Sequence, residues 1–242
     1  MATYDELAGR LVLITGGANG IGQAMVEAFH AQGAVVCFCD LDDRAGVRLA
    51  KRLGDRAEFA KVNLCREAGI KRWVAHLAKR HGDIHVLINN AAILEFSGLI
   101  GMASLDGARA QFEVNFWGYL AMCRAFAPVL AGNGGGAIVN ILSEAARLNA
   151  PFVGAYSASK AAAWSLTQGV RAELRAQGTH VLAAFPSSTD TAMLAGLDGD
   201  PGDARVALAQ EGDVAGQHPA RDRRHAARHH GHQLAARQGL DV

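Results

Sequence analysis

The chain has 242 residues, about the length of one α/β domain, and half of them are apolar, so it can bury a sizeable core and is not disordered throughout. The formal net charge of +1 provides no long-range electrostatic attraction to nucleic acid or to an anionic membrane surface. No apolar run is long enough to span a bilayer, and the first ten residues, with Asp5 and Glu6, lack the apolar segment of a signal peptide.

The cysteines indicate a reducing compartment. Cys37, Cys39, Cys65 and Cys123 form no CxxC motif and have no metal-ligand spacing with histidine. We expect all four to be small buried side chains, with no bound metal, in a cytoplasmic protein.

Short apolar runs alternate with helical periodicity along most of the chain. Strands and helices alternating at this spacing are typical of βαβ units, whose right-handed crossovers place helices on both faces of a parallel sheet. We therefore predict a single α/β domain with a doubly wound parallel sheet of six to seven strands. In chain order, the expected elements are strand 11–14, helix 21–32, strand 34–39, helix 43–53, strand 57–62, helix 68–80, strand 86–88, helix 106–131, strand 137–142, helix 152–176 and strand 180–185.

A glycine-rich run, TGGANGIG at 15–22, lies between the first expected strand and the first expected helix. A dinucleotide pyrophosphate needs backbone N–H groups at a helix N-terminus and no Cβ atoms in its way. We expect Gly16, Gly20 and Gly22 to allow the tight turn, the close approach of the backbone to the pyrophosphate and the tight contact between helix and strand. The glycine spacing is wider than G-x-G-x-x-G, so it is the position within a βαβ unit that favours a cofactor site.

Asp40 ends the second expected strand, eighteen residues after Gly22. A carboxylate there can accept hydrogen bonds from both adenosine ribose hydroxyls and would repel a 2′-phosphate. The loop carries Asn19 where a basic residue would favour NADP, so we favour NAD over NADP. The alternative role for Asp40, capping the next helix, is better filled by Asp42 and Asp43.

Tyr156 and Lys160 lie four residues apart on the expected helix 152–176 and share one face. A phenol with a pKa of about 10 is a poor base at neutral pH, and a neighbouring ammonium lowers that pKa. The tyrosine can then take a proton from an alcohol as hydride leaves carbon, or donate one to a carbonyl. Such pairs also occur on ordinary surface helices, so the pair alone identifies nothing.

Two further polar residues accompany the pair. Ser143 follows the fifth expected strand, and strand C-terminal ends face the ligand crevice in this topology, so its hydroxyl can hold a substrate oxygen. Asn115 lies among apolar neighbours in helix 106–131 and needs a partner there. Its amide can hold a helix kink or a water that links Lys160 to solvent.

Taken together, these motifs resemble the short-chain dehydrogenase/reductase family over about residues 7–191. The resemblance implies a Rossmann-type sheet, NAD(P) binding and a catalytic tetrad of Asn115, Ser143, Tyr156 and Lys160. The motifs that match in order and spacing are TGGANGIG at 15–22, NNAA at 89–92, VNFWG at 114–118, Ser143 and YSASK at 156–160.

The resemblance also implies the cofactor contacts. Lys160 would bind the nicotinamide ribose, the turn at 89–91 would line the adenosine side, and Asn63 would stand for an aspartate that bonds adenine. Thr191 would bond the nicotinamide carboxamide. The candidate cofactor-binding residues are Gly16, Asn19, Gly20, Ile21, Gly22, Asp40, Leu41, Asn63, Leu64, Asn90, Ala91, Tyr156, Lys160, Pro186, Thr189 and Thr191.

The C-terminal part departs from the family pattern. Ser187 replaces a usual glycine, which would cost on the order of 1 kcal/mol if the position needs φ > 0. Residues 217–242 hold half of the ten histidines and show no seventh strand. We therefore divide the chain into a Rossmann-type dehydrogenase domain with its own substrate pocket, 1–210, and an irregular His/Arg/Ala-rich tail, 211–242. Disorder and a reading-frame change both account for such a tail.

We expect an oxidoreductase that transfers a hydride between NAD(H) and a secondary alcohol or ketone, as a homodimer or homotetramer without nucleic-acid or membrane partners. The alternative is a catalytically impaired NAD-binding protein of the same fold. A nucleic-acid binder acting through the tail is disfavoured because no aromatic platform accompanies the charges. The expected pocket walls, 93–101, 144–150 and 187–210, suggest a moderately apolar substrate.

Overall fold

The computed structural model describes residues 5–149 and 151–187. Six strands form one parallel sheet in the order β3-β2-β1-β4-β5-β6, which confirms the predicted doubly wound Rossmann-type fold. The tail 211–242, Thr189 and Thr191 lie outside the described residues, as does any seventh strand. No helix in the described ranges is both long and apolar enough to cross a membrane.

The helices and strands end within two residues of their predicted limits, with one interruption. The expected helix 106–131 contains a π-helical segment, η2, in its middle. The main elements are β1 (Leu11–Thr15), α1 (Gly20–Ala31), β2 (Val35–Asp40), α2 (Asp43–Leu53), β3 (Ala57–Lys61), α3 (Glu67–His81), β4 (Val86–Asn89), α4 (Asp106–Phe112), η2 (Glu113–Gly118), α5 (Tyr119–Gly132), β5 (Gly136–Ile141), α6 (Gly154–Leu174) and β6 (Thr179–Ala184).

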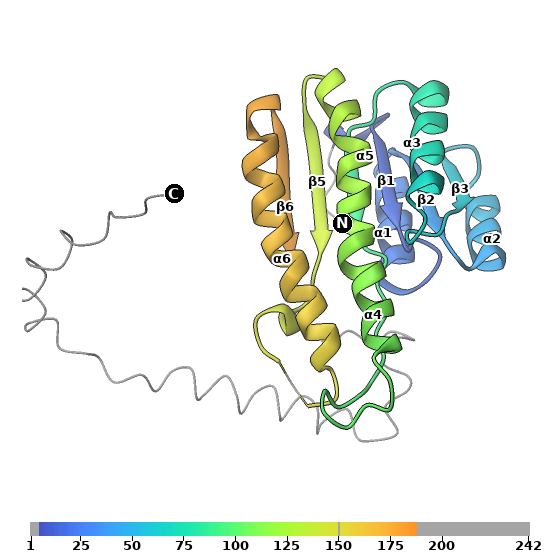
Figure 1. Ribbon diagram of the computed structural model, residues 1–242. Coiled ribbons are helices and arrows are strands. Elements are labelled where there is room, and N and C mark those ends of the chain that lie inside the picture. The colour runs from blue at the N-terminus through green and yellow to red at the C-terminus, as the bar shows by residue number, and fades with distance from the viewer. Residues whose placement is uncertain (1–4, 150, 188–242) are drawn as a thin grey trace, which may run out of the picture.

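Two apolar layers enclose the sheet. In Figure 1, α3, α5 and α6 lie in front of it and α1 lies behind it. Alternate strand residues point to opposite faces, so Leu13 of β1 packs with Ile70 of α3, whereas Val12 packs with Val26 of α1. Because both faces are covered, the strands read as continuous apolar runs, which is why the sequence pattern located them.

A row of buried polar side chains crosses from the sheet to α6. Asn89 Nδ2 donates to Asn140 Oδ1 at 2.9 Å, Asn140 Nδ2 donates to Thr167 Oγ1 at 2.8 Å, and Thr167 Oγ1 donates to the Ala163 carbonyl at 2.7 Å. Asn89 and Asn140 are register partners at the carboxyl ends of β4 and β5. A buried amide without partners is costly, so this row fixes α6 against the two strands that lead into the site.

The topology places the site. The chain proceeds from β1 to β2 and β3 on one side, then returns to β4, β5 and β6 on the other, so the strand order reverses between β1 and β4. Ligands of open parallel sheets bind at the carboxyl ends of the strands beside such a reversal. The glycine-rich turn after β1 and the residues after β4 and β5 meet there.

The contact between α2 and β3 depends on a glycine. A Cβ on Gly46 would lie 2.1 Å from Phe59 Cε2, and the Phe59 ring is itself held by Phe38 at a centroid distance of 5.4 Å. By contrast, a Cβ on the exposed Gly169, in α6, would meet nothing within 4 Å.

We predict opposite stability changes for the same substitution at these two helical glycines. Gly46→Ala should lower the free energy of unfolding by about 1–2 kcal/mol because the clash outweighs the gain in helix propensity. Gly169→Ala should raise it by about 0.5–1 kcal/mol because only the propensity changes. Denaturant melts of both variants test this, and equal shifts would contradict the packing described.

Candidate active site

The glycine-rich turn is joined to the end of β4 through Thr15. The buried Thr15 hydroxyl accepts hydrogen bonds from the backbone N–H groups of Asn90 at 2.9 Å and Ala91 at 3.0 Å. Asn90 Nδ2 donates in return to the carbonyls of Thr15 and Gly16, both at 3.0 Å. The amide of Asn90 therefore shapes the turn. Sequence reasoning missed Thr15, although a threonine that ends an apolar strand before glycines was a visible signal.

The close packing of this turn requires glycine. A Cβ on Gly22 would lie 1.8 Å from the Gly16 carbonyl oxygen, and Gly16 and Gly20 have φ of +65° and +54°. Asn19 precedes α1 as its N-cap residue, but its side chain makes no capping hydrogen bond. The N-terminus of α1, including Ile21, is thus not capped by a side chain, and helix N-terminal N–H groups of this kind bind phosphate.

Asp40 lies beside this turn, as predicted. Its Oδ2 accepts from the Ala18 N–H at 3.1 Å, and its Oδ1 accepts from the N–H groups of Leu41 at 2.7 Å and Asp42 at 3.1 Å. Asp42 caps α2 by accepting from the Ala45 N–H at 2.9 Å, so the capping role falls where expected. Each Asp40 oxygen keeps acceptor capacity for a further donor. The carboxylate is therefore held beside the glycine-rich turn with acceptor capacity to spare.

The remaining candidates surround the same edge of the sheet. Leu41 is exposed after β2, and Asn63 is exposed after β3, where its Oδ1 accepts from the Cys65 N–H at 2.9 Å. Leu64 is buried. The Pro186 carbonyl accepts from the Glu144 N–H at 3.2 Å, which ties the end of β6 to the turn after β5.

Asn115 links three parts of the site. It is fully buried in η2, its Oδ1 accepts from the Ile93 N–H, and its Nδ2 donates to the Ile93 carbonyl, both at 2.9 Å. Nδ2 also donates to Ser159 Oγ at 3.0 Å, and Ser159 Oγ donates to the Tyr156 carbonyl at 2.7 Å. Of the two roles considered for its amide, the structure shows a helix irregularity around Asn115, a π-helical segment of a kind frequent at functional sites. Ser159 was not singled out from the sequence.

Lys160 is 1% exposed, so its ammonium is surrounded by protein. Its Nζ donates to the Ile141 carbonyl at 2.9 Å and to Tyr119 Oη at 3.2 Å. Burial lowers the pKa of Lys160 to about 7, because a low-dielectric environment disfavours the charged form. Nζ lies 5.8 Å from the centre of the Tyr156 ring. The predicted neighbours on α6 therefore come together.

The predicted lowering of the Tyr156 pKa by Lys160 is wrong for this structure. Burial raises the pKa of Tyr156, and a hydrogen bond with Ser143 opposes the rise only in part. The reason is that desolvation of the buried phenol outweighs the attraction of the Lys160 ammonium, whose Nζ is bonded to the Ile141 carbonyl and Tyr119 Oη. Tyr156 is therefore a protonated phenol at neutral pH, with Ser143 as its hydroxyl neighbour.

The strain expected at Ser187 is absent. Among the described residues, Phe152 is the non-glycine residue with positive φ, at 65°, and Ser187 is not. Phe152 is two-thirds exposed just before α6, and its carbonyl accepts from the Ser97 N–H at 2.8 Å. This contact joins one expected pocket wall, 93–101, to the segment that follows the second expected wall, 144–150. The third wall lies outside the described residues except for Ser187.

The cysteine prediction holds for three of four residues, since Cys65 is exposed and the others are buried. Among described side chains, Cys37, Glu58 and His81 place ligand atoms within 4.8 Å of one another. Glu58 Oε2, however, lies 3.0 Å from Arg80 Nε and 2.9 Å from His81 Nε2, and burial raises the pKa of Cys37 to about 12. Glu58 is thus already bound to Arg80 and His81, and the Cys37 thiol stays protonated, while the absence of a metal stays a prediction.

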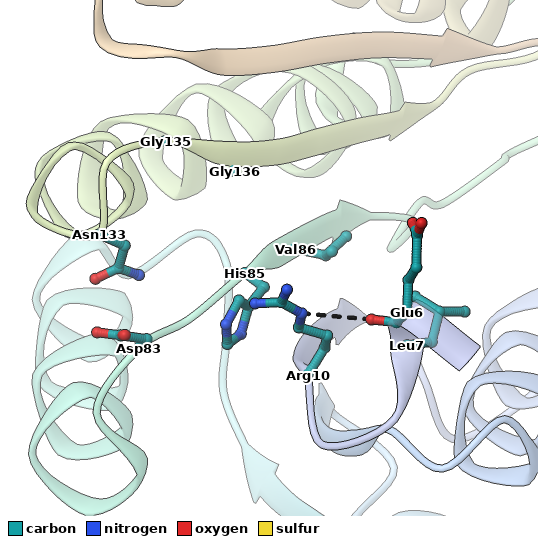
Figure 2. A pocket seen from close by; sticks show the side chains of 9 residues that line it. All are labelled: Glu6, Leu7, Arg10, Asp83, His85, Val86, Asn133, Gly135 and Gly136. Carbon is teal, nitrogen blue, oxygen red and sulfur yellow. Dashed lines mark hydrogen bonds between the residues drawn. The ribbon is translucent and has the colours of Figure 1, made fainter. Parts of the chain in front are cut away.

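A hollow also lies at the amino ends of β1, β4 and β5, around Arg10, His85 and Gly136 (Figure 2). His85 Nδ1 accepts from the Leu11 N–H at 3.1 Å, and burial lowers the pKa of His85. A neutral histidine committed to the backbone supports the fold. The hollow faces the edge of the sheet opposite to Asp40 and Ser143 and is not part of the candidate site.

Comparisons with known proteins agree with this geometry. The profile of the short chain dehydrogenase family matches residues 10–201. Sorbitol dehydrogenase of Cereibacter sphaeroides is 37% identical over 194 residues, which are 80% of this chain and 75% of that protein.

Two solved structures share the fold. The 3-ketoacyl-(acyl-carrier-protein) reductase of Brucella melitensis, complexed with NADH, superposes with a TM-score of 0.75 at 28% identity and covers 78% of this chain and 79% of that one. The gluconate 5-dehydrogenase of Burkholderia cenocepacia J2315, in complex with NADP and tartrate, gives 0.76 at 28% identity and covers 82% and 79%. The chain therefore belongs to the short-chain dehydrogenase/reductase family and, like its relatives named as sorbitol and galactitol dehydrogenases, is an oxidoreductase acting on CH–OH groups.

Proposed function

We propose that the protein is an NAD-dependent oxidoreductase that interconverts a secondary alcohol and the corresponding ketone, with Tyr156 as general acid and base. The observation that carries this proposal is the meeting of Tyr156, Ser143 and a fully buried Lys160 at the carboxyl end of β5, beside an uncapped helix N-terminus that suits a dinucleotide. When bound, the nicotinamide ring accepts or supplies the hydride.

Tyr156 moves the proton in this proposal. Its raised pKa keeps the phenol protonated at neutral pH, which suits donation to a carbonyl oxygen. The Ser143 hydroxyl holds that oxygen beside the phenol. After donation, the Lys160 ammonium favours the phenolate that remains, because opposite charges attract strongly where water is excluded. Asn115 supports the arrangement through Ser159, whose hydroxyl donates to the backbone of Tyr156.

The preference for NAD rests on Asp40 and its surroundings. The carboxylate adjoins the turn at Ala18, where it accepts from ribose hydroxyls and repels a 2′-phosphate. Asn19, the loop position where a cation would favour NADP, donates its amide to Asp42 at 3.4 Å. Since the two solved relatives were obtained with NADH and with NADP, direct titration decides between the two cofactors.

The substrate is proposed only as a class. The sorbitol dehydrogenase and gluconate 5-dehydrogenase among the relatives favour a secondary alcohol or its ketone. A cytoplasmic location and a homodimer or homotetramer remain predictions from the sequence, as does the domain division at residue 210. The alternative, a catalytically impaired NAD-binding protein, would bind NADH and show no turnover with any alcohol or ketone of a broad panel.

We predict that Tyr156→Phe lowers turnover by roughly 10²–10⁴-fold, since it removes the general acid and base. NADH binding, followed by nicotinamide fluorescence, should be nearly unchanged, because the ring stays in place. The assay uses secondary alcohols with NAD and ketones with NADH. Wild-type turnover in the variant would exclude Tyr156 from the proposed role.

We predict that Asp40→Ala weakens NADH binding by about tenfold or more and narrows the preference over NADPH, because it removes the ribose acceptor and its repulsion of phosphate. Asp43→Ala is the matched control, since it removes the same charge three residues further along, on the exposed first turn of α2. If both variants keep the wild-type ratio of NADH to NADPH affinities, the NAD preference has another source.

A further inference from the structure

Lys160 lies near a second tyrosine besides Tyr156 and is hydrogen-bonded to the hydroxyl of that second one. Tyr119, the first residue of α5, is completely buried. Its Oη donates to the Ile141 carbonyl at 2.8 Å and accepts from Lys160 Nζ at 3.2 Å, while Nζ donates to the same carbonyl at 2.9 Å. The three polar atoms form a closed triangle in which each is bonded to the other two.

We propose that Tyr119 is a positioning residue for the reaction: its hydroxyl fixes the Lys160 ammonium against the Ile141 carbonyl and stabilises the positive charge that Tyr156 requires. The inference rests on the proposed function. It adds to the tetrad a phenol from a different helix, which reaches the site by way of the lysine.

The groups around Lys160 supply no negative charge that could stabilise its ammonium. No carboxylate of the described residues forms an ion pair with Lys160, and the facing titratable groups are Tyr119 from α5 and Tyr156 from α6. The thiol of Cys123 lies near Tyr119, and burial raises the pKa of both, so both are neutral. The charge is therefore stabilised by two oxygen acceptors, the Ile141 carbonyl and Tyr119 Oη.

The placement of Tyr119 explains why this contact is specific. Tyr119 directly follows η2, the π-helical segment that holds Asn115, and packs with Leu142 and Ala163. Its donor hydrogen is committed to Ile141, so the lone pairs of Oη face the ammonium. A tyrosine in this state can only accept from Lys160, which favours the charged lysine over the neutral one.

The test measures the charge of Lys160 directly. The chain has five lysines, and the other four, Lys51, Lys61, Lys71 and Lys79, are exposed. In protein labelled with ¹³C at lysine Cε, the resonance that titrates near pH 7 belongs to Lys160, and Lys160→Met identifies it by its loss. Tyr119→Phe keeps the ring and removes the hydroxyl.

We expect Tyr119→Phe to move the Lys160 titration to lower pH by about one unit, because a hydrogen bond to a charged group is lost. The decline of ketone reduction with rising pH should move by the same amount, since reduction needs both a charged Lys160 and a protonated Tyr156. Thr167→Val is the matched control: it removes another buried hydroxyl, two turns further along α6, and should leave the Lys160 titration in place.

An unchanged Lys160 titration in Tyr119→Phe overturns the proposal, and so does an equal shift in Thr167→Val. If Tyr119→Phe does not fold, Tyr119→Leu removes the same hydroxyl and must give the same shift. The titration needs no substrate, so it separates the two proposals. If the Lys160 titration shifts in Tyr119→Phe but the wild-type protein shows no turnover, only the proposed function is overturned. If the wild-type protein turns over normally but the Lys160 titration is unshifted in Tyr119→Phe, only the role of Tyr119 is overturned.

Discussion

A buried ammonium is the constraint on which the candidate site depends. Lys160 reaches the carboxyl end of β5 only because α6 lies directly on the sheet, and that position removes its side chain from water. Desolvation then lowers its pKa to about 7, while the unfolded chain keeps the ordinary value. Between these two values the unfolded chain binds a proton that the folded chain does not, so this group makes the fold more stable as pH rises through that window. At neutral pH the buried Lys160 therefore lowers the free energy of unfolding.

Polar contacts around Lys160 offset part of this destabilisation, and they connect the glycine-rich turn with α6. Thr15 joins the glycine-rich turn to Ala91, and two residues further on Ile93 is held by Asn115. Asn115 continues through Ser159 to the backbone of Tyr156. A continuous path of buried and partly buried hydrogen bonds and short backbone segments thus runs from the glycine-rich turn to α6, and such contacts are strong and directional where water is excluded. The row from Asn89 to Thr167 fixes the same helix further along.

Sequence reasoning located the elements and most of the candidate site, and its errors have one cause. Tyr156, Lys160, Ser143 and Asn115 were singled out by their places in the expected elements, and the resemblance to the short-chain dehydrogenase/reductase family joined them into one candidate site. Thr15, Ser159 and Tyr119 were missed because each has a partner 41 to 76 positions away along the chain, respectively Ala91, Asn115 and Lys160. The pKa of Tyr156 was assigned the wrong direction because sequence spacing shows that Lys160 shares its helix face but does not show how deeply both are buried.

The sequence by itself determined the alternation of strands and helices, the glycines that the turn requires, and the residue types on the catalytic helix, because these depend on periodicity and on contacts between near neighbours. The tertiary structure alone decided the π-helical segment around Asn115, the exposure of Cys65, the φ of Ser187, which is not positive, and the triangle of Lys160, Tyr119 and Ile141. The physical reason is that burial and hydrogen-bond geometry arise only when distant segments pack together, and in this protein they control both the charge of Lys160 and the protonation of Tyr156.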